Sequence, residues 1–458
     1  MLNKIHIENF KAWKKLNLGL GQVTGLFGTN SSGKSSILQF LLMLKQTKNA
    51  TDRGIVLDFG GPTGQLVNLG SYKDMIHSHN LNESLQWEIN WTLKDKASIF
   101  DPAKKRTEVL ASGSELTIQS KVRAEPLPSL VSDFLEYQFG GFRFSLTPKR
   151  DRGPEFTLKA HAPEGSEFRF IRNQQRAWAL PGPVKTHLFP DQAKTYYQNA
   201  EFLGLFEAEY ESMMDSIYYL GPLREYPKRE YPWSGTSPID VGVRGERTIE
   251  AILAATAKGE TRNLRYKAPR KKFQEMIAYW LKELRLIDQF EIQEIGTGAN
   301  LYRALVKRDK KSTEALLTDV GFGVSQVLPA LVLLYYVPEG STVIMEQPEI
   351  HLHPAVQSGL ADVILTAAKT RSLQVIVESH SEHILRRFQR RVAEQEFDAR
   401  KIKLYFCSNL EGQSRIEDLE MDLLGQILNW PPAFFGDEMN EIATMQKAIL
   451  KRRAEAAA

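Results

Sequence analysis

The residues best suited to chemistry in this sequence begin with a glycine-rich turn near the N-terminus. Residues 28–35 read GTNSSGKS, which matches the pattern GxxxxGK[ST] at every defined position. The apolar stretch 23–27 predicts a strand before the turn, and an apolar helix is predicted over 35–45. The candidate phosphate-binding residues are Gly28, Asn30, Ser31, Ser32, Gly33, Lys34, Ser35 and Ser36.

This spacing is the one that a phosphate-binding loop requires. Glycines let the backbone wrap closely around phosphate, and the N–H groups at the start of the following helix face the anion. Lys34 would then reach the terminal phosphates, and the Ser35 hydroxyl would join the shell of a Mg²⁺ ion. A chance glycine–serine turn is the alternative, but the order of strand, turn and helix favours an ATP site with Mg²⁺.

A second group of candidate residues follows two apolar strands in the last third of the chain. Residues 342–345 predict a buried strand that ends at Glu346, where a carboxylate can orient Mg²⁺ through its water. Glu346 could instead simply end a core strand. Further along, the apolar stretch 375–377 ends at the sequence Glu-Ser-His-Ser, which contains His380. A glycine-rich segment, 317–326, lies upstream of Glu346.

With these motifs in this order, the sequence resembles the ABC-type ATPases of the RecF, SMC and OLD group. The resemblance is specific over roughly 1–80 and 300–390 and loose between them. It implies a signature loop that contacts the γ-phosphate held by the opposite subunit, and a switch histidine that senses the γ-phosphate. The implied signature residues are Gly321, Gly323, Ser325 and Gln326. The implied catalytic residues are Glu346, Gln347, Glu349 and His380, with Ser35 and Glu346 holding Mg²⁺.

One residue departs from the pattern of these ATPases. They normally carry a glutamate after the acid that ends the strand, and it polarises the attacking water; here the residue is Gln347. An amide can orient water but cannot accept its proton, and loss of a positioned base typically costs about 10²–10⁴-fold in rate. Three explanations stay open: Glu349 is the base, hydrolysis is slow by design, or the protein binds ATP mainly as a scaffold. We favour slow hydrolysis.

Several histidines invite a different interpretation, a metal site. They are His351, His353, His380 and His383. His351 and His353 belong to residues 349–354, which resemble the PE-x-HLHP segment that follows the acid in this group of ATPases, and His380 is the implied switch histidine. With no cysteine nearby, a histidine-bound metal is therefore the weaker hypothesis.

Positioning these residues requires an α/β scaffold. We expect a P-loop ABC-ATPase head with a mixed central sheet, an antiparallel β lobe and a helical lobe. Alternating residues near the N-terminus predict a hairpin, and residues 85–180 are strand-like. Residues 190–290 are predicted to be helical around a proline-rich loop, and 289–380 to be rich in strand again. The last segment, about 400–458, is predicted to hold one strand, 402–407, and a terminal helix. The predicted units are 1–85 with the phosphate loop, 86–290 as an insertion, 291–395 with the signature and switch histidine, and 396–458 as a C-terminal extension.

Composition sets wider limits. The chain has 458 residues, 42% hydrophobic and 25% charged, which is ordinary for a globular protein. We find no apolar run long enough for a transmembrane helix and no secretory signal, so no membrane association is expected. The lone cysteine, Cys407, excludes an internal disulfide and fits a cytoplasmic location. The net charge of +4 neither requires nor excludes nucleic acid.

The resemblance supports two roles. The first is a regulatory ATPase of bacterial anti-phage defence or genome maintenance, a head-to-head homodimer or higher oligomer whose ATP state controls a separate effector such as a nuclease. The second is a RecF-like repair ATPase that binds DNA or RNA, supported by a basic run over 262–272 with Tyr266 and Phe273 nearby. A transporter subunit is a distant third. Too few residues follow His380 for the Toprim nuclease domain of OLD proteins.

Two further features remain open at this stage. Arg224 and Arg244 lie in loops dense in glycine, proline and charge, and could contact phosphate or a partner, or nothing at all. The aromatic residues of the segment 429–438 are expected to pack on the head or on a partner.

Overall fold

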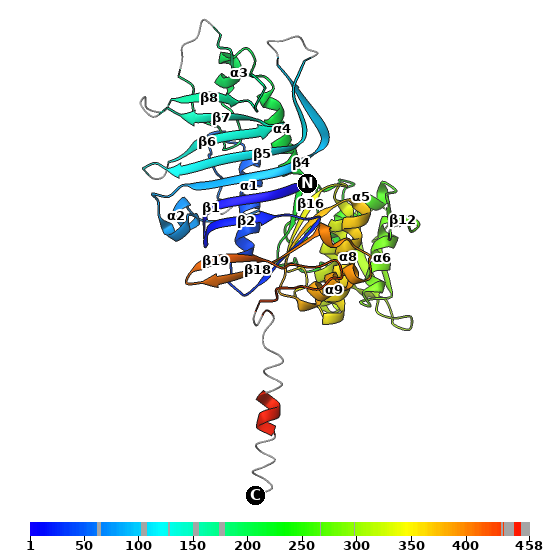
Figure 1. The fold of residues 1–458 in the computed structure, drawn as a ribbon. Coiled ribbons are helices and arrows are strands. Elements are labelled where there is room, and N and C mark those ends of the chain that lie inside the picture. Colours follow the sequence, from blue (N-terminus) through cyan, green and yellow to red (C-terminus); the bar gives the residue numbers. More distant parts are fainter. Residues whose placement is uncertain are drawn as a thin grey trace.

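A computed structural model of the chain shows two lobes that share a central sheet (Figure 1). An antiparallel sheet occupies one lobe, and most of the helices gather in the other, around the central sheet. The structure describes residues 1–61, 66–101, 108–126, 129–149, 155–173, 179–265, 267–296, 298–431, 434 and 444–449.

The central sheet has six strands in the order β19-β18-β3-β17-β16-β9. Strands β18, β3, β17, β16 and β9 run parallel, and β19 pairs antiparallel with β18. The predicted mixed sheet is therefore confirmed. The sequences of the parallel strands are buried and apolar, as expected for strands that are covered on both faces. The bounds are β3 Val23–Gly28, β9 Ile217–Leu220, β16 Thr342–Glu346, β17 Gln374–Glu378, β18 Ile402–Leu410 and β19 Gln413–Asp418.

The antiparallel lobe is a seven-stranded sheet in the order β2-β1-β4-β5-β6-β7-β8. Alternate residues such as Trp87, Ile89 and Trp91 are buried, as expected for a sheet with one covered face. The helix α1, Lys34–Asn49, covers that face, and its Phe40 ring lies 5.7 Å from the ring of Trp87. The strand bounds are β1 Leu2–Phe10, β2 Trp13–Gly19, β4 Leu85–Phe100, β5 Val109–Ala124, β6 Leu130–Phe139, β7 Phe142–Pro148 and β8 Phe156–His161.

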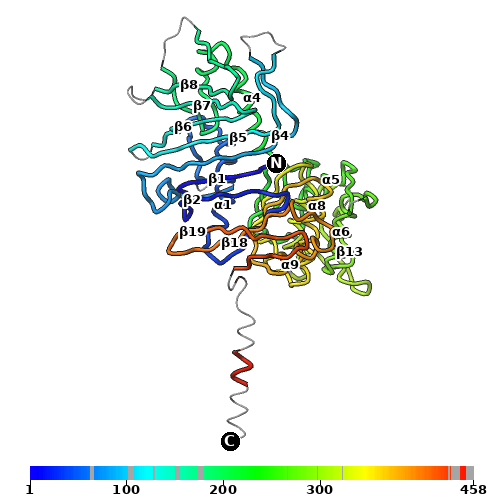
Figure 2. The backbone as a smooth tube through the Cα atoms, viewed as in Figure 1, coloured from blue at the N-terminus to red at the C-terminus, as the bar shows by residue number. Residues whose placement is uncertain are grey.

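The predicted N-terminal hairpin is confirmed as β1 and β2. Because these strands share a sheet with β4–β8, the antiparallel lobe crosses the predicted unit boundary at 85/86. Figure 2 shows the N-terminal strands beside the C-terminal strands β18 and β19, and β18 pairs with β3 from Ile402 to Cys407. Strands from the first 28 residues and strands from residue 402 onward therefore belong to one packed body. The division of the chain into four units stays a prediction.

The helical lobe surrounds the other side of the central sheet. Its helices are α5 Thr248–Ala257, α6 Phe273–Glu283, α7 Phe322–Tyr336, α8 Pro354–Arg371 and α9 Glu382–Ala393. Its short strands are β10 Tyr231–Pro232, β11 Thr261–Asn263, β12 Arg270–Lys272, β13 Gln289–Glu294, β14 Leu301–Lys307 and β15 Ala315–Leu316. Elsewhere lie α2 Tyr72–Met75, α3 Asp191–Tyr196, α4 Leu203–Asp215 and the 3₁₀ turns His77–His79, Leu317–Asp319 and Ala399–Lys401.

Three secondary-structure predictions need correction. The stretch 190–290 contains β9, because a four-residue apolar run cannot be told from a helical segment by periodicity. The stretch 289–380 contains the long helices α7 and α8 besides its strands. The C-terminal segment has a second strand, β19, which pairs with β18. A terminal helix was also predicted, and residues 444–449 are helical.

Aromatic residues of the C-terminal segment pack on the head. The ring of Phe434 lies 4.7 Å from that of Phe406 on β18 and 6.3 Å from that of Phe27 on β3. Arg386 of α9 stacks over the ring of Trp430 at 4.6 Å. The expected packing on the head is thus confirmed for these two residues, and 435–438 lie outside the described residues.

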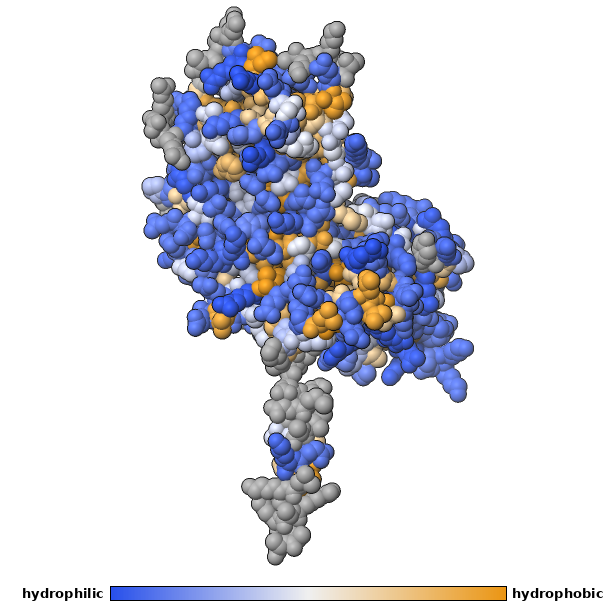
Figure 3. Space-filling view, in the orientation of Figure 1, coloured by the Kyte–Doolittle hydropathy of each residue, from blue (hydrophilic) through white to orange (hydrophobic). Residues whose placement is uncertain are grey.

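In the described part of the chain, every helix is too short or too polar to cross a bilayer. The face drawn in Figure 3 is mostly hydrophilic, with hydrophobic residues in small groups.

The close approach of β3 to β18 can be tested at Gly28. Its φ of +135° and the carbonyl oxygen of Cys407, 1.9 Å from where a Cβ would lie, leave no room for a side chain. We expect Gly28→Ala to destabilise the fold by about 3 kcal/mol or more, measured by thermal unfolding. Gly61→Ala is the matched control, because its Cβ would meet no atom of the described residues within 4 Å. Equal unfolding midpoints for the two variants would contradict this account.

Candidate nucleotide-binding site

The carboxyl ends of four parallel strands meet at one edge of the central sheet. Glu378 on β17 pairs with Leu26 on β3 and with Glu346 on β16, and Met345 on β16 pairs with Leu220 on β9. The phosphate loop, the two glutamates and the loop after β9 therefore lie side by side. In open α/β sheets, ligands bind at this edge.

The phosphate loop is held in a fixed shape. Gly33 caps α1 in the left-handed conformation, and Ser31 is also left-handed, which lets successive N–H groups line a concave turn. The indole N–H of Trp13 donates to the Gly33 carbonyl at 3.0 Å. A side chain at Gly33 would come within 2.4 Å of the Ser414 hydroxyl oxygen, so only glycine fits there.

Lys34 lies inside this turn. Its ammonium group donates to the carbonyl oxygens of Gly28 at 3.1 Å and Thr29 at 2.7 Å, and to the Ser32 hydroxyl at 3.3 Å. Thr29, Asn30 and Ser31 are exposed, while Ser36 continues the helix behind them. The Lys34 ammonium group therefore lies directly beneath the exposed part of the loop. A phosphate bound there could replace the backbone carbonyl oxygens as its hydrogen-bond acceptors.

Two buried carboxylates lie beside the loop. The Ser35 hydroxyl donates to Glu378 Oε1 at 3.0 Å, and the Tyr219 hydroxyl donates to Glu346 Oε1 at 2.9 Å. Burial and the neighbouring charge of Glu378 raise the pKa of Glu346 to about 7. Burial also raises the pKa of Glu378, although its hydrogen bond from Ser35 acts in the opposite direction.

Glu349 and His380 come together behind these carboxylates. The Ser379 hydroxyl and the His380 backbone N–H both donate to Glu349 Oε1 at 2.8 Å. Glu349 Oε2 is buried and has no hydrogen-bond partner among the described residues, and burial raises the pKa of this carboxyl. The predicted switch residue His380 is exposed at the end of β17, and burial of part of its ring, with Lys34 nearby, lowers its pKa.

Gln347 occupies a strained backbone position between the acids. Its φ is +42°, which few residues other than glycine adopt, and its N–H donates to the Glu378 carbonyl oxygen at 2.8 Å. The strain turns the chain directly after Glu346 and fixes the position of Gln347 at the edge of the sheet.

The signature segment differs from the expected loop. Only Gly321 is outside the helix, as the N-cap of α7, and Gly323, Ser325 and Gln326 belong to its first turns. The continuous apolar sequence of α7 explains the helix. Gly321 is exposed, whereas Ser325 and Gln326 are each only 8% exposed.

The oxygen atoms at the sheet edge suit Mg²⁺. A hydroxyl and carboxylates are the ligands this ion prefers, and Glu378 Oε2, like Glu349 Oε2, is buried without a hydrogen-bond partner among the described residues. A histidine-bound metal finds no such support: His353 Nδ1 accepts the Ala355 N–H as the cap of α8. Over the described residues, no three potential ligands cluster as a further metal site.

Two residues of this arrangement are absent from the predicted site. Glu378 ends an apolar strand just as Glu346 does, so the same sequence signal could have identified it. Tyr219 gave no such signal, because it lies on β9, which was not predicted as a strand.

Three family models match the sequence. Residues 1–177 match a family described as "AAA ATPase domain", and residues 199–386 match one described as "AAA domain, putative AbiEii toxin, Type IV TA system". Residues 398–445 match "Protein of unknown function (DUF3696)". The first two matches contain every residue of the site described above. Two separate segments of this chain therefore match AAA ATPase family models.

Other comparisons give more distant similarities. The sequence matches no curated protein. An SMC head bound to the C-winged helix domain of ScpA is 14% identical over 92% of this chain and 98% of its own, with a TM-score of 0.42. The SMC head domain from Thermotoga maritima is 12% identical over 92% and 99%, with a TM-score of 0.39. With such low identities and TM-scores, these similarities carry no conclusion about the activity of this protein.

The buried charge of Glu346 leads to a stability prediction. Because its pKa is raised, the charged form of this carboxyl destabilises the fold. The full destabilisation is present above pH 7, and none of it remains below about pH 4.5. We expect Glu346→Gln to raise the thermal midpoint at pH 8 in EDTA without nucleotide, with a gain of up to about 3 kcal/mol that disappears toward pH 4.5. Exposed Glu230→Gln is the control; a lower midpoint for Glu346→Gln at pH 8 would contradict the prediction.

Proposed function

We propose that the protein binds ATP with Mg²⁺ and hydrolyses it slowly, as a nucleotide-dependent switch. The observation that carries the proposal is the meeting of Lys34, the Ser35–Glu378 pair and Glu346 at one sheet edge, next to Gln347. These groups provide a cation for phosphate and oxygen ligands for a metal. The usual general base after Glu346 is missing.

Each group has a separate task in this proposal. The N–H groups of the phosphate loop and the Lys34 ammonium bind the phosphates. The Ser35 hydroxyl, Glu378 and Glu346 hold the metal, and Tyr219 fixes the orientation of Glu346 through their 2.9 Å hydrogen bond. When bound, Mg²⁺ offsets the charge of the phosphate oxygens. A cation there would also reduce the repulsion between the two neighbouring carboxylates.

Slow hydrolysis follows from the chemistry of Gln347. Its amide can orient a water molecule but cannot take its proton. Glu349 is the alternative base, since its Oε1 is held by two donors while its Oε2 is left without a partner among the described residues. His380 would then respond to the terminal phosphate from the end of β17.

Turnover measurements test this proposal. We expect purified protein to bind ATP and turn it over slowly, Lys34→Ala to lose binding, and Gln347→Glu to raise turnover by roughly 10²-fold, because a carboxylate can act as base. Phosphate release is the measurement, with ATP binding followed in parallel. Rapid turnover by the wild type that is lost in Glu349→Gln would instead make Glu349 the base and end the slow-switch proposal.

We also propose a head-to-head homodimer in which the signature segment of one subunit meets the ATP of the other. The N-terminus of α7 supports this, since exposed Gly321 leaves the first N–H groups accessible to an anion. Gly323, Ser325 and Gln326 continue this helix. Because Ser325 is buried, contact with a partner's phosphate would require the residues around it to shift, whereas the backbone at Gly321 needs no such change.

The dimer can be tested with Gly321→Asp. An aspartate fits here, because no atom of the described part of the chain lies within 4 Å of its Cβ position and a carboxylate favours a helix N-terminus, so stability should not fall. It would repel the partner's phosphate, and we expect ATP-dependent dimerisation, measured by light scattering, to be lost.

Mixing variants provides the control for that experiment. A mixture of Gly321→Asp with Lys34→Ala should recover dimers, because one of the two composite sites is then intact. Normal ATP-dependent dimerisation of Gly321→Asp alone would contradict the proposed interface.

The biological role we propose is control of a separate effector, such as a nuclease, in bacterial anti-phage defence or genome maintenance. A matched family whose description names a toxin of a type IV system supports this direction. The head would then supply the nucleotide switch, and the C-terminal extension, 396–458, is a candidate for effector contact. We also propose that the protein is located in the cytoplasm.

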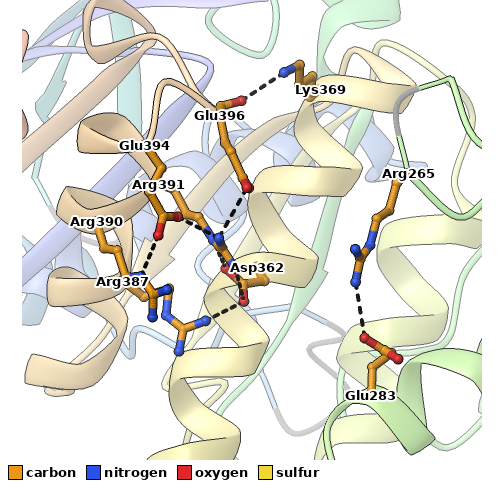
Figure 4. Close-up of polar contacts among 9 residues, drawn as sticks. All are labelled: Arg265, Glu283, Asp362, Lys369, Arg387, Arg390, Arg391, Glu394 and Glu396. Atoms are coloured by element: carbon orange, nitrogen blue, oxygen red, sulfur yellow. Dashed lines mark hydrogen bonds and ion pairs between the residues drawn. The ribbon is translucent and has the colours of Figure 1, made fainter.

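A RecF-like DNA-binding role is the second candidate. Its support is the hairpin of β11 and β12, where Arg270, Lys271 and Lys272 are exposed. The two aromatic residues add nothing to this support, because Tyr266 lies outside the described residues and the ring of Phe273 is buried. Nearby arginines are engaged by acids, as Figure 4 shows. Asp362 pairs with Arg387 and Arg391, and Glu283 pairs with Arg265. Because these arginines are paired with acids, their positive charge is offset and less of it is available to nucleic-acid phosphates. The nucleotide-dependent switch is therefore the stronger proposal.

A further inference from the structure

Arg224 lies in the loop after β9, at the same sheet edge as the phosphate loop. The loop is fixed on both sides of it: the Gly221 N–H donates to the Val243 carbonyl oxygen and the Glu225 N–H to the Arg244 carbonyl oxygen, each at 2.8 Å. Arg224 is 6% exposed, whereas the preceding Leu223 is 69% exposed. The backbone therefore directs the arginine inward.

The guanidinium group of Arg224 has no hydrogen-bond partner in the part of the chain that the structure describes. None of its three nitrogen atoms is solvent-accessible, and none has an acceptor among the described residues. By contrast, the equally buried Arg371 donates to the Leu334 carbonyl oxygen at 3.0 Å. A buried cation without acceptors costs folding free energy, so a fold that retains one commonly uses it in function.

The groups that face Arg224 are those of the nucleotide site. Its charge acts on Tyr219, Glu349 and Glu346. Even so, no carboxylate oxygen of the described residues lies within the 4.0 Å of an ion pair with it, and Glu349 Oε2 has no hydrogen-bond partner either. Arg224 and Glu349 are therefore near enough to influence each other electrostatically, yet they form no ion pair with each other. A structural arginine would hydrogen-bond an acceptor of the protein, as Arg371 does.

We propose that Arg224 binds the terminal phosphate of ATP from within its own subunit and thereby lets the site distinguish ATP from ADP. Five N–H donors in a planar fork match the oxygen atoms of a phosphate group. Phosphate oxygens would supply the acceptors that the guanidinium lacks, and Lys34 approaches the phosphates from the opposite, P-loop side. This inference rests on the proposed ATP site and adds a residue to it.

The same loop links this contact to the surface. Leu223 and Tyr226, on either side of Arg224, are 69% and 72% exposed. They share a short backbone segment with Arg224, and hydrogen bonds hold this segment at Gly221 and Glu225. Leu223 and Tyr226 are therefore exposed side chains next to the proposed phosphate contact.

The test compares ATP and ADP binding by calorimetry, with and without EDTA. Arg224→Met keeps the length of the side chain and removes the charge. We expect it to weaken ATP binding about 10- to 100-fold, as for loss of charge-assisted hydrogen bonds, and ADP binding by no more than about twofold. The difference should persist in EDTA, since the contact is direct. Without nucleotide, the thermal midpoint of Arg224→Met should be equal to or above that of the wild type.

Arg244→Met is the matched control, because Arg244 lies in the adjoining segment, is exposed and pairs with Glu225 at 3.5 Å. It should leave both affinities unchanged. Equal losses of ATP and ADP affinity in Arg224→Met, or a lower midpoint without nucleotide, would overturn the inference and make Arg224 structural. Failure of the wild type to bind either nucleotide would instead refute the proposed ATP site itself.

Discussion

The structure depends on placing several buried charges at one edge of a parallel sheet. Glu346 and Glu378 end neighbouring strands in register, so their carboxylates lie side by side where burial favours the neutral form. Lys34 and Arg224 approach the same edge from the two flanking loops. Such an arrangement costs folding free energy unless a ligand of matching charge completes it, and a metal with a polyphosphate has the matching charges.

Much of the remaining fold can be understood as support for this edge. The antiparallel lobe brings Trp13 under the phosphate loop, and α1 connects that lobe to Lys34. The helical lobe presents α7 and fixes the loop after β9 by pairing it with the segment around Val243. β18 presses against Gly28 so closely that only glycine fits. Both lobes therefore constrain the same few residues.

The proposed switch draws on this shared constraint. A site whose charges are unsatisfied without ligand gains stability when nucleotide binds, so binding can be coupled to the position of nearby loops. Gln347 would prolong the ATP-bound state, because the residue directly after Glu346 is an amide that cannot act as a base. The exposed residues next to Arg224 and the exposed N-terminus of α7 are the surfaces that such a change would reach.

The sequence by itself determined the phosphate loop, the strand that ends at Glu346, the mixed sheet and the antiparallel lobe, because these depend on local spacing and on the period of apolar residues. It also identified Gln347 as the departure from the usual pattern. Only the tertiary structure decided that Glu378 accepts the Ser35 hydroxyl, that β9 completes the sheet, and that Arg224 is buried beside Glu346. These follow from strand pairing between distant segments, which no local pattern specifies.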